Sequence, residues 1–410
     1  MSRVIGVDEY RATVTTLIGD ATAAVLPLAA CDGLVLAGDV RAGVSLPPFD
    51  NSAMDGYAVR SVDVVGASRE RPVELPVTAD IPAGLVDVPA LLPGTAHRIM
   101  TGAPVPAGAD SIVMVENTDA GSFAPAPRDV VRVHAPTAPG THLRRTGEDV
   151  VRGTVALAAG TVLGPAQLGL AAAVGVAELR VRVPPRVLVV STGSELVTPP
   201  SELRHGQIYE SNSVMLAAAL SSLGCRVEVV RAVVDDVAEF RAVLEPKLAA
   251  ADLLITSGGV SAGAYEVVKD ALTSAGVTFG KVAMQPGGPQ GCGRWNGVPV
   301  VTLPGNPVSV LVSFEAFLRP ALLTSLGHPV ADRRRVRARL TESLSSPKGR
   351  RQFRRGFYRH AEGEVTGEVG PRGGPGSHLL AAFTQANCLI VLGEDVTEAA
   401  KGDEVDVLLL

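Results

Sequence analysis

Aromatic residues are scarce in this 410-residue sequence, and no cationic excess is present. Aromatic side chains make up 4% of the chain, which disfavours a surface that stacks on nucleic-acid bases. The formal net charge is −5, so the chain as a whole does not attract phosphate backbones or an anionic membrane surface. We therefore expect no nucleic-acid partner.

Cysteine pairs and long apolar runs are also missing. The four cysteines lie far apart and form no CxxC pair: Cys31, Cys225, Cys292 and Cys388. This spacing disfavours a zinc site or a redox motif and predicts buried free thiols in a reducing compartment. The apolar run of residues 21–30 is too short to span a bilayer and contains Pro27, and no signal peptide precedes it. We expect a cytoplasmic protein that inserts no segment into a membrane.

Glycine (44 residues) and proline (30 residues) are abundant and indicate many turns. The length exceeds what one hydrophobic core supports and predicts several domains. Residues 8–19 have the spacing of an amphipathic helix, residues 27–40 alternate like a pair of strands, and residues 166–176 form a short apolar helix. Residues 46–139 carry short Val-rich runs between Pro-Ala-Gly and Pro-Gly turns, which predicts a small all-β module.

After Pro184-Pro185 the sequence alternates between apolar strands and helices. The predicted strands are 186–192, 226–233, 252–259 and 297–305, and the predicted helices are 212–224, 236–250, 264–276 and 306–322. Near-continuous apolar strands that alternate with helices predict a doubly wound parallel sheet covered on both faces. Asn212 or Ser213 is the expected N-cap of the first helix, and Pro246 predicts a kink or an early end in the second. Beyond residue 328, short strands and turns predict a final small β-domain.

Three glycine-bearing segments follow predicted strands, at 191–195 (STGSE), 257–263 (SGGVSAG) and 304–309 (PGNPVS). Open α/β sheets bind ligands at the carboxyl ends of their strands, where glycines let backbone N–H groups approach a phosphate. Neither GxxxxGK[ST] nor GxGxxG is present, which disfavours a P-loop NTPase and an ordinary dehydrogenase. The three segments predict a pocket for a phosphorylated small molecule that is held in another way.

Polar residues also cluster in the β-rich part, at 50–56 (DNSAMDG), and Thr101 stands beside a glycine. Asx turns explain single pairs of the cluster but not the whole string. Residues 144–149 (RRTGED) combine two arginines with two carboxylates, for which surface ion pairing is the alternative explanation. The basic run 348–360 is typical of a strand with one solvated cationic face, which favours an acidic peptide or an anionic substrate over nucleic acid.

Seven strings together resemble the MoeA family of molybdopterin molybdenumtransferases, which includes the E domain of gephyrin. They are PPFDNSAMDGYAVR, RIMTGAPVP, RRTGED, STGSEL, GQIYESNS, SGGVSAG and LPGNPVS. The resemblance covers essentially the whole chain and implies a multidomain fold of α/β plus β type, in an elongated homodimer. It implies four subdomains: a discontinuous linker (1–45 and 140–182), an inserted β-rich subdomain (46–139), a molybdopterin-binding, MogA-like α/β domain (183–328) and a C-terminal β-barrel (329–410).

The resemblance also implies a reaction. Molybdate would be inserted into adenylylated molybdopterin with release of AMP, assisted by Mg²⁺ or another divalent cation. The cleft would join the α/β domain of one subunit to the β-rich domain of the other. The implied catalytic residues are Asp55, Asp149, Glu195 and Glu266, of which Glu195 and Glu266 would hold the cation. The implied substrate-binding residues are Thr101, Arg144, Glu148, Thr192, Ser194, Gly258, Gly259, Ser261, Gly263, Pro304, Gly305, Asn306, Pro307 and Ser309.

Four positions depart from the family pattern. Ser194 and Ala264 stand where relatives have acids, and Gln285 and Gly288 stand where relatives have lysines. Losing two lysines predicts weaker anion binding, unless Arg294 or another arginine substitutes. A second hypothesis is therefore a gephyrin-like dimeric scaffold with reduced or lost catalysis. It would bind a partner peptide, such as the FtsZ tail or a membrane receptor, between the α/β domain and the barrel.

Overall fold

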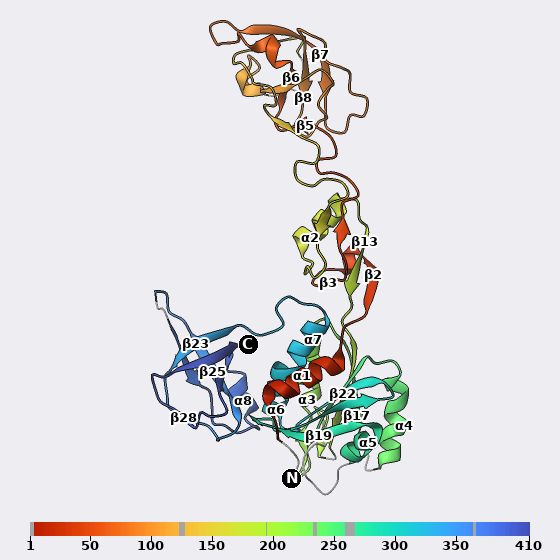
Figure 1. Cartoon of the computed structure of the whole chain (residues 1–410), viewed down its shortest axis with the longest axis vertical. Coiled ribbons are helices and arrows are strands. Elements are labelled where there is room, and N and C mark those ends of the chain that lie inside the picture. Colours follow the sequence, from red (N-terminus) through yellow and green to blue (C-terminus); the bar gives the residue numbers. More distant parts are fainter. Residues whose placement is uncertain (1–3, 123–127, 194, 233–235, 259–266, 364–365) are drawn as a thin grey trace. The chain divides into compact units, whose positions relative to one another are not determined.

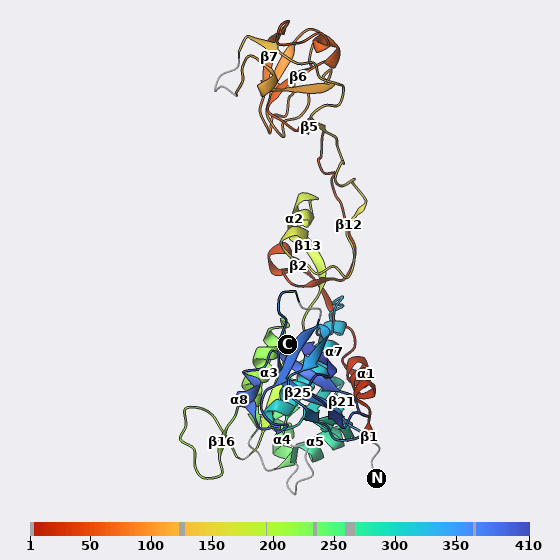
Figure 2. The ribbon, with the colours of Figure 1, turned by 90° about the vertical axis from the view of Figure 1, so that its left-hand side faces the viewer.

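The computed structural model describes residues 4–122, 128–193, 195–232, 236–258, 267–363 and 366–410 (Figures 1 and 2). Its internal contacts divide the chain into two compact units. Unit 1 comprises Met1–Ala24, Gly160–Val162 and Arg180–Leu410. Unit 2 comprises Val25–Ala159 and Leu163–Leu179.

The predicted α/β sheet lies in unit 1 and has seven strands in the order β1-β19-β21-β22-β18-β14-β17. These strands are β1 Val4–Ile5, β14 Arg186–Thr192, β17 Arg226–Ala232, β18 Leu253–Ser257, β19 Val277–Val282, β21 Pro289–Trp295 and β22 Val298–Leu303. The neighbours β17, β14, β18 and β22 run parallel, as predicted. The prediction of an all-parallel sheet is wrong for β21, which runs antiparallel to both β22 and β19. A two-residue turn of Asn296 and Gly297, with φ of 49° and 85°, joins β21 to β22.

Helices cover both faces of this sheet (Figure 1). They are α1 Val7–Ile18, α3 Asn212–Ser221, α4 Val237–Leu248, α5 Val267–Ala275, α6 Pro307–Ser313, the π-helical η4 Phe314–Leu318 and α7 Arg319–Ser325. Helices α1, α3, α6 and α7 pack in one apolar cluster with Val187 and Val189 of β14. Helices α4 and α5 pack in another with Leu188 and Val190. Alternate residues of β14 thus face opposite helix layers, which explains its continuous apolar sequence.

The helix ends differ from the predictions by small amounts. Ser211, rather than Asn212 or Ser213, precedes α3, and the backbone N–H of Ser213 donates to the Glu210 carboxylate (2.8 Å). Helix α4 continues for two residues beyond Pro246 and ends at Leu248.

Among the residues that the structure describes, one helical run, Pro307–Ser325, is long enough and apolar enough to cross a membrane by length and composition. The expectation that no segment reaches this length is therefore wrong. The run is 19 residues long, and 72% of its apolar window is buried inside the structure. A core helix of a globular unit has the same properties.

The C-terminal part of unit 1 is a closed barrel, as predicted. Five strands pair in a ring: β25 Arg351–Arg359, β26 Gly367–Pro371, β23 Arg335–Leu340, β29 Glu404–Leu409 and β27 Cys388–Leu392. The short strand β20, Met284–Gln285, pairs with β25 and brings the segment before β21 against the barrel. The smaller elements of unit 1 are β15 Leu196–Val197, β16 Ile208–Tyr209, β24 Leu344–Ser345, β28 Glu398–Ala399 and α8 Leu380–Phe383.

Unit 2 contains the predicted β-rich module. Its five-stranded sheet has the order β10 Val130–Val133, β7 Val73–Ile81, β8 Ala96–Ile99, β6 Gly56–Val59 and β9 Ser111–Met114. Three short helical turns accompany it: η1 Leu28–Ala30, η2 Ser61–Val64 and η3 Val115–Asn117. The remaining elements are β2 Ala23–Pro27, β3 Val35–Leu36, β4 Val40–Arg41, β5 Asn51–Ser52, β11 Leu143–Arg144, β12 Val155–Leu157, α2 Pro165–Ala173 and β13 Glu178–Arg182.

Residues 27–40 do not form a strand pair with each other, contrary to the prediction. Strand β3 pairs with β13, and β4 pairs with β12, so both partners follow the inserted β-sheet in the sequence. All four cysteines are free, and three of them are buried. Burial raises the pKa of the Cys225 thiol to about 11 and that of Cys388 to about 12, as expected for unreactive structural thiols.

Candidate functional site

The carboxyl ends of β14, β18 and β22 meet at one edge of the sheet. Ser257 lies beside Ser191 on one side and Leu303 on the other, so the glycine-bearing segments that follow these strands come together. The backbone N–H of Gly258 donates to Leu303 O (3.1 Å). Gly258 has a φ of 92°, and a Cβ there would lie 2.8 Å from Thr192 O, so only glycine fits this crossing.

A buried polar network lies beneath these loops at the start of α3. Asn212 is 9% exposed, and its side-chain Nδ2 donates to Ser257 Oγ (3.0 Å) and to Gly305 O (2.7 Å). Glu210 is 3% exposed, and its carboxylate accepts from Ser191 Oγ (3.0 Å) and from the Ser213 backbone and hydroxyl. The network ties the first turn of α3 to all three strand ends. Sequence analysis named Asn212 and Ser213 as candidate N-caps and otherwise used the string GQIYESNS only for the family resemblance, so it assigned these residues no role in the site.

A pocket of about 770 Å³ opens beside the loop that follows β22. Of the predicted substrate-binding residues that the structure describes, four line it, namely Pro304, Gly305, Asn306 and Ser309. The other lining residues come from β1, from the β19–β21 segment and from the barrel: Val4, Lys281, Val282, Met284, Gln285, Pro286, Gly287, Gly288, Pro289, Gly349, Arg350, Pro375, Gly376, Ser377 and His378. Three other predicted residues do not line this pocket. Thr192 and Gly258 lie at the same sheet edge, and Pro307 follows the lining residue Asn306.

The barrel wall of the pocket is the loop Arg372–His378. Asn306 Nδ2 donates to Ser377 Oγ (2.8 Å), and the backbone N–H of Val308 donates to Ser377 O (3.1 Å). From the other side, Arg355 donates to Arg372 O (3.4 Å), to Gly376 O (3.0 Å) and to Gly374 O. The loop is therefore held by hydrogen bonds from the start of α6 on one side and from Arg355 of the barrel on the other.

Arg355 is only 4% exposed, although sequence analysis placed the basic run of residues 348–360 on a solvated strand face. The run does form strand β25, but its arginines do not all face solvent. Burial, with added repulsion from Arg354, lowers the pKa of the Arg355 guanidinium. The missed signal is the Phe353-Arg-Arg-Gly356 pattern, because its alternation places one arginine on an inward face.

The lining of the pocket contains cations and no carboxylate among the described residues. Lys281 and Arg350 line it, together with His378. Arg294, proposed from sequence as a substitute cation, does not line it. Its guanidinium donates to Gly297 O (2.8 Å) and Leu17 O (2.7 Å).

In unit 2 the structure brings Asp55 and Thr101 together. The Asp55 carboxylate accepts from the backbone N–H of Thr101 (2.7 Å) and from its hydroxyl (2.9 Å), through the same oxygen Oδ1. Both residues are exposed. The carboxylate is therefore fixed in direction while its second oxygen carries no hydrogen bond within the described residues.

Arg144, Glu148 and Asp149 are all exposed, on or after β11. Glu148 Oε2 accepts from the backbone N–H of Arg145 (2.9 Å). Within the described chain, no hydrogen bond or ion pair joins these three side chains to Asp55 or Thr101.

Asp50, next to β5, accepts from Arg145 Nη1 (2.7 Å) and from the backbone N–H of Thr146 (2.8 Å). These contacts, led by the Thr146 backbone, lower the pKa of Asp50.

The predicted cation ligands are only partly described. Glu195 is exposed, and its carboxylate folds over Gly193, where an added Cβ would lie 2.6 Å from Glu195 Oε2. Glu266 and Ser194, Gly259, Ser261, Gly263 and Ala264 lie outside the described residues. Among the described residues, no group of three His, Cys, Asp or Glu side chains is arranged to hold a metal ion. A single carboxylate such as that of Glu195 is compatible with a Mg²⁺ site, because Mg²⁺ is usually bound by one or two carboxylates together with substrate phosphates.

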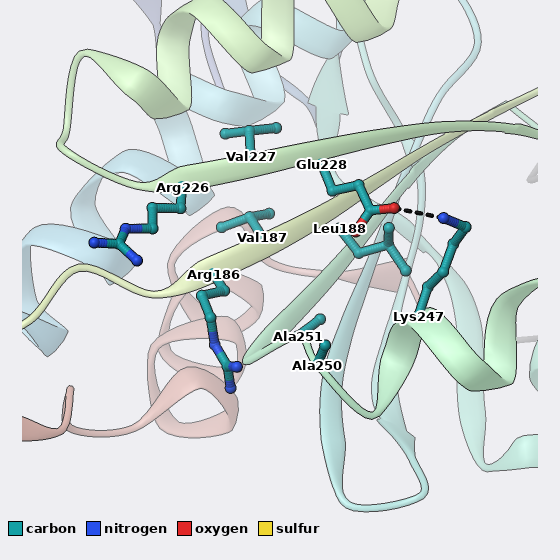
Figure 3. A pocket seen from close by; sticks show the side chains of 9 residues that line it. All are labelled: Arg186, Val187, Leu188, Arg226, Val227, Glu228, Lys247, Ala250 and Ala251. Atoms are coloured by element: carbon teal, nitrogen blue, oxygen red, sulfur yellow. Dashed lines mark hydrogen bonds and ion pairs between the residues drawn. The ribbon is translucent and has the colours of Figure 1, made fainter.

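A smaller concavity of about 220 Å³ lies at the amino ends of β14 and β17 (Figure 3). Its floor is apolar, and Lys247 forms an ion pair with Glu228 (2.5 Å) across it. Parallel sheets bind ligands at the opposite ends of their strands, and the glycine-bearing loops are there. The larger pocket is therefore the candidate site.

Comparison with known proteins gives matches along nearly the whole chain. Three family models match: the MoeA N-terminal region (domains I and II) at residues 5–175, a probable molybdopterin binding domain at 188–324 and the MoeA C-terminal region (domain IV) at 337–410. The chain is 54% identical to molybdopterin molybdenumtransferase 2 of Mycobacterium tuberculosis over 408 residues, covering 98% of each. It is 36% identical over 381 residues to the molybdopterin molybdenumtransferase of Haemophilus influenzae, covering 91% of this chain and 90% of that one. The solved structure of the molybdopterin biosynthesis MoeA protein of Pyrococcus horikosii matches with a TM-score of 0.82 and 31% identity, covering 99% of both chains.

Proposed function

This chain belongs to the MoeA family of molybdopterin molybdenumtransferases, and we propose that its 770 Å³ pocket is where molybdate enters adenylylated molybdopterin. The enzyme is a transferase of molybdenum cofactor biosynthesis. The observation that carries the proposal is the lining of the pocket. Glycines and cations gather where the loop after β22 meets the barrel, and no described carboxylate opposes an anionic ligand there.

The chemistry of the substrates fits this lining. Molybdate is a dianion, and adenylylated molybdopterin carries phosphates, so both favour N–H donors and cationic side chains. Asn306 and Ser309 offer polar side chains at the pocket wall, next to the start of α6. We assign the pterin phosphate to the strand-end residues: Thr192, Ser194, Gly258, Gly259, Ser261, Gly263, Pro304, Gly305, Asn306, Pro307 and Ser309.

Asp55 and Thr101 supply the fixed carboxylate of the proposed reaction. The two hydrogen bonds to Oδ1 orient Asp55. In this orientation Oδ2 can accept a proton from a water molecule, or can orient that water molecule toward the adenylyl phosphate. We further propose that the enzyme is a homodimer, in which Asp55 and Thr101 of one copy serve the pocket of the other. Arg144, Glu148 and Asp149 are assigned to the same cleft, and the division into four subdomains is part of this proposal.

For the divalent cation we propose Mg²⁺, held by Glu195 and Glu266 together with the substrate phosphates. When bound, such an ion neutralises charge on the phosphates during release of AMP. The exposed Glu195 carboxylate, close to the strand-end loops in sequence, supports this assignment. The scaffold hypothesis is not favoured, because relatives up to 54% identical are named for the transferase activity.

The decisive experiment is complementation of a bacterial strain that lacks its own molybdenumtransferase, with the activity of a molybdenum-dependent oxidoreductase as the readout. We expect the wild-type chain to restore this activity. The Asp55→Asn variant should lower in vitro turnover about a hundredfold or more, because a positioned carboxylate contributes that much to proton transfer. Asp87→Asn is the matched control, since Asp87 is also an exposed carboxylate of unit 2. A wild-type protein that is expressed and folded but does not restore the oxidoreductase activity of this strain would refute the proposal.

A further inference from the structure

The seven-stranded sheet of unit 1 has an open edge at β17. This strand is last in the sheet order and pairs with β14 alone among the described strands. The backbone N–H of Arg226 donates to Pro185 O, directly before β14 (3.3 Å). Because the bonding direction alternates along a strand, the N–H and C=O groups of Val227, Val229 and Arg231 point away from β14. An extended segment placed beside β17 can therefore bond to these groups.

A hollow of about 220 Å³ lies beside this edge, on the face of the sheet that α4 covers (Figure 3). Helix α4 ends at Leu248, and Ala250 and Ala251 follow it, so no large side chain of that segment fills the space over the starts of β14 and β17. Arg226 and Glu228 of β17 line the hollow. Alternate side chains of an added strand would stand on this same face.

The lining of the hollow includes one cation without a partner. Arg186 pairs with Asp252 (2.8 Å), and Lys247 pairs with Glu228 (2.5 Å). The side chain of Arg226 is exposed and has no hydrogen bond or ion pair within the described residues. Figure 3 shows its guanidinium pointing away from the Glu228–Lys247 pair. On a chain with a net charge of −5, this unpaired cation favours a carboxylate of a ligand.

We propose that the open edge of β17 and this hollow form a docking site for a partner protein, which adds one extended segment to the sheet. The main chain of the segment bonds to Val227, Val229 and Arg231. One apolar side chain packs in the hollow, and an acidic side chain two positions away binds Arg226. Main-chain bonds of this kind supply affinity, and the alternate side chains supply specificity. The site shares no residue with the proposed reaction pocket.

The side chains of β17 favour such a segment over a second copy of this chain. Val229 is 41% exposed, and an added strand would cover it. A second β17 would bring its own Arg226 and Arg231 to an edge that already carries these cations, and like charges on adjacent strands destabilise a sheet. An acidic segment complements them instead. The other end of the sheet is different, because its last strand β1 has only two residues, Val4–Ile5.

The test is selection of binders from a random peptide library on the full-length protein, followed by fluorescence titration of the selected peptides. We expect these peptides to share an apolar residue and an acid two positions apart. Arg226→Glu should weaken their binding about tenfold or more, because it removes a charge-assisted contact, whereas Arg226→Lys should stay within a few-fold of wild type. Val229→Pro removes one N–H at the open edge and should also weaken binding about tenfold.

Hydrogen exchange of the wild-type protein gives a readout that does not depend on the folding of any variant. Bound peptide should slow exchange of the Val227, Val229 and Arg231 amides. Arg180→Glu is the matched control, because Arg180 is an exposed arginine on β13, which pairs with strands on both sides. This control should bind the peptides as wild type does.

Three results would overturn the proposal. The first is a selection that yields no peptide. The second is a set of peptides that bind Arg226→Glu as tightly as wild type and protect other amides. The third is self-association of the wild-type chain that Arg226→Glu abolishes, measured by sedimentation, because a second copy would then be the occupant of this edge.

Discussion

At the residue scale, single side chains inside unit 1 hold the wall of the pocket. Arg355 is the clearest case, because its buried guanidinium has three carbonyl partners and no carboxylate partner among the described residues. Guanidinium N–H groups diverge in one plane, so one arginine can reach carbonyls several residues apart. A buried cation held in this way costs desolvation energy, which indicates that the shape of the Arg372–His378 loop depends on it.

Replacing Arg355 with lysine should therefore damage the pocket while keeping the charge. The ammonium cannot span Arg372, Gly374 and Gly376, so the buried cation loses hydrogen bonds, each of which contributes about 1.5–3 kcal/mol. We expect Arg355→Lys to lower the free energy of unfolding by about that amount and to raise the KM for adenylylated molybdopterin more than it lowers kcat. Urea denaturation and steady-state kinetics measure both.

Arg359→Lys on the same strand is the control, because Arg359 forms an exposed ion pair with Glu368. Its effect on stability should stay within about 0.5 kcal/mol. An Arg355→Lys variant as stable and as active as this control would show that the three carbonyl contacts do not shape the pocket.

At the element scale, α3 connects the strand ends to one another. Its first residue, Asn212, joins the end of β18 to the loop after β22 through Ser257 and Gly305. The helix therefore adds a side-chain connection between two strand ends that the backbone hydrogen bond from Gly258 to Leu303 also joins. Glu210, just before the helix, connects the start of α3 to the end of β14 by accepting a hydrogen bond from Ser191 Oγ.

Asn212→Leu should loosen this connection. The leucine donates no hydrogen bond, so the buried Ser257 Oγ loses a partner, which costs about 1–3 kcal/mol in the free energy of unfolding. The loop after β22 loses its connection to α3 through Gly305 O as well. Val214→Ala on the same helix is the control, because Val214 is 62% exposed and should change stability by no more than about 0.5 kcal/mol. Urea midpoints of the two variants provide the comparison, and equal midpoints would contradict the role of Asn212.

Elements with strong local patterns could be predicted from the sequence, and elements defined by distant partners could not. The continuous apolar run of β14 and the spacing of α1 predict those elements to within a residue. Strand β21 was missed because Gly291 and Gly293 resemble turn residues. An added Cβ at either position would lie 2.4 Å from a neighbouring atom, so these glycines are required by close packing.

The candidate site shows the same division. Glycine-bearing loops at the ends of successive parallel strands could be predicted to meet, because parallel topology requires it. The contact between Asp55 and Thr101 could not be derived from spacing, since it joins residues 46 positions apart. Lys281, Arg350 and Arg355 are brought to the pocket by β19 and by the barrel. Tertiary contacts, among them the pairing of β20 with β25, bring these two regions together.

At the scale of the whole molecule, the chain forms two compact units, and each contains a carboxylate stabilised in its charged form. In unit 2, Thr146 and Arg145 hold the pKa of Asp50 below its ordinary value of 3.8. In unit 1, the Arg186 guanidinium does the same for Asp252, and Arg351 for Asp8. Folding lowers the pKa of such a carboxyl, so its ionised form stabilises the folded state at pH values above the pKa of the unfolded chain. This stabilisation is lost as the pH falls through the lower pKa of the folded state.

The units should therefore respond separately to acid. Differential scanning calorimetry between pH 7 and pH 3 should resolve two thermal transitions, since the contacts of each unit are mostly internal. The midpoint temperature of both transitions should decrease when the pH is lowered below about 4. Asp50→Asn should lower the midpoint of one transition at neutral pH and weaken its pH dependence while leaving the other unchanged. Asp252→Asn should do the reverse. Both effects should be modest, because these side chains are 38% and 45% exposed and solvent screens their ion pairs. A single transition that both variants shift equally would mean that the two units unfold as one cooperative body, and the carboxylates would then report on the whole chain.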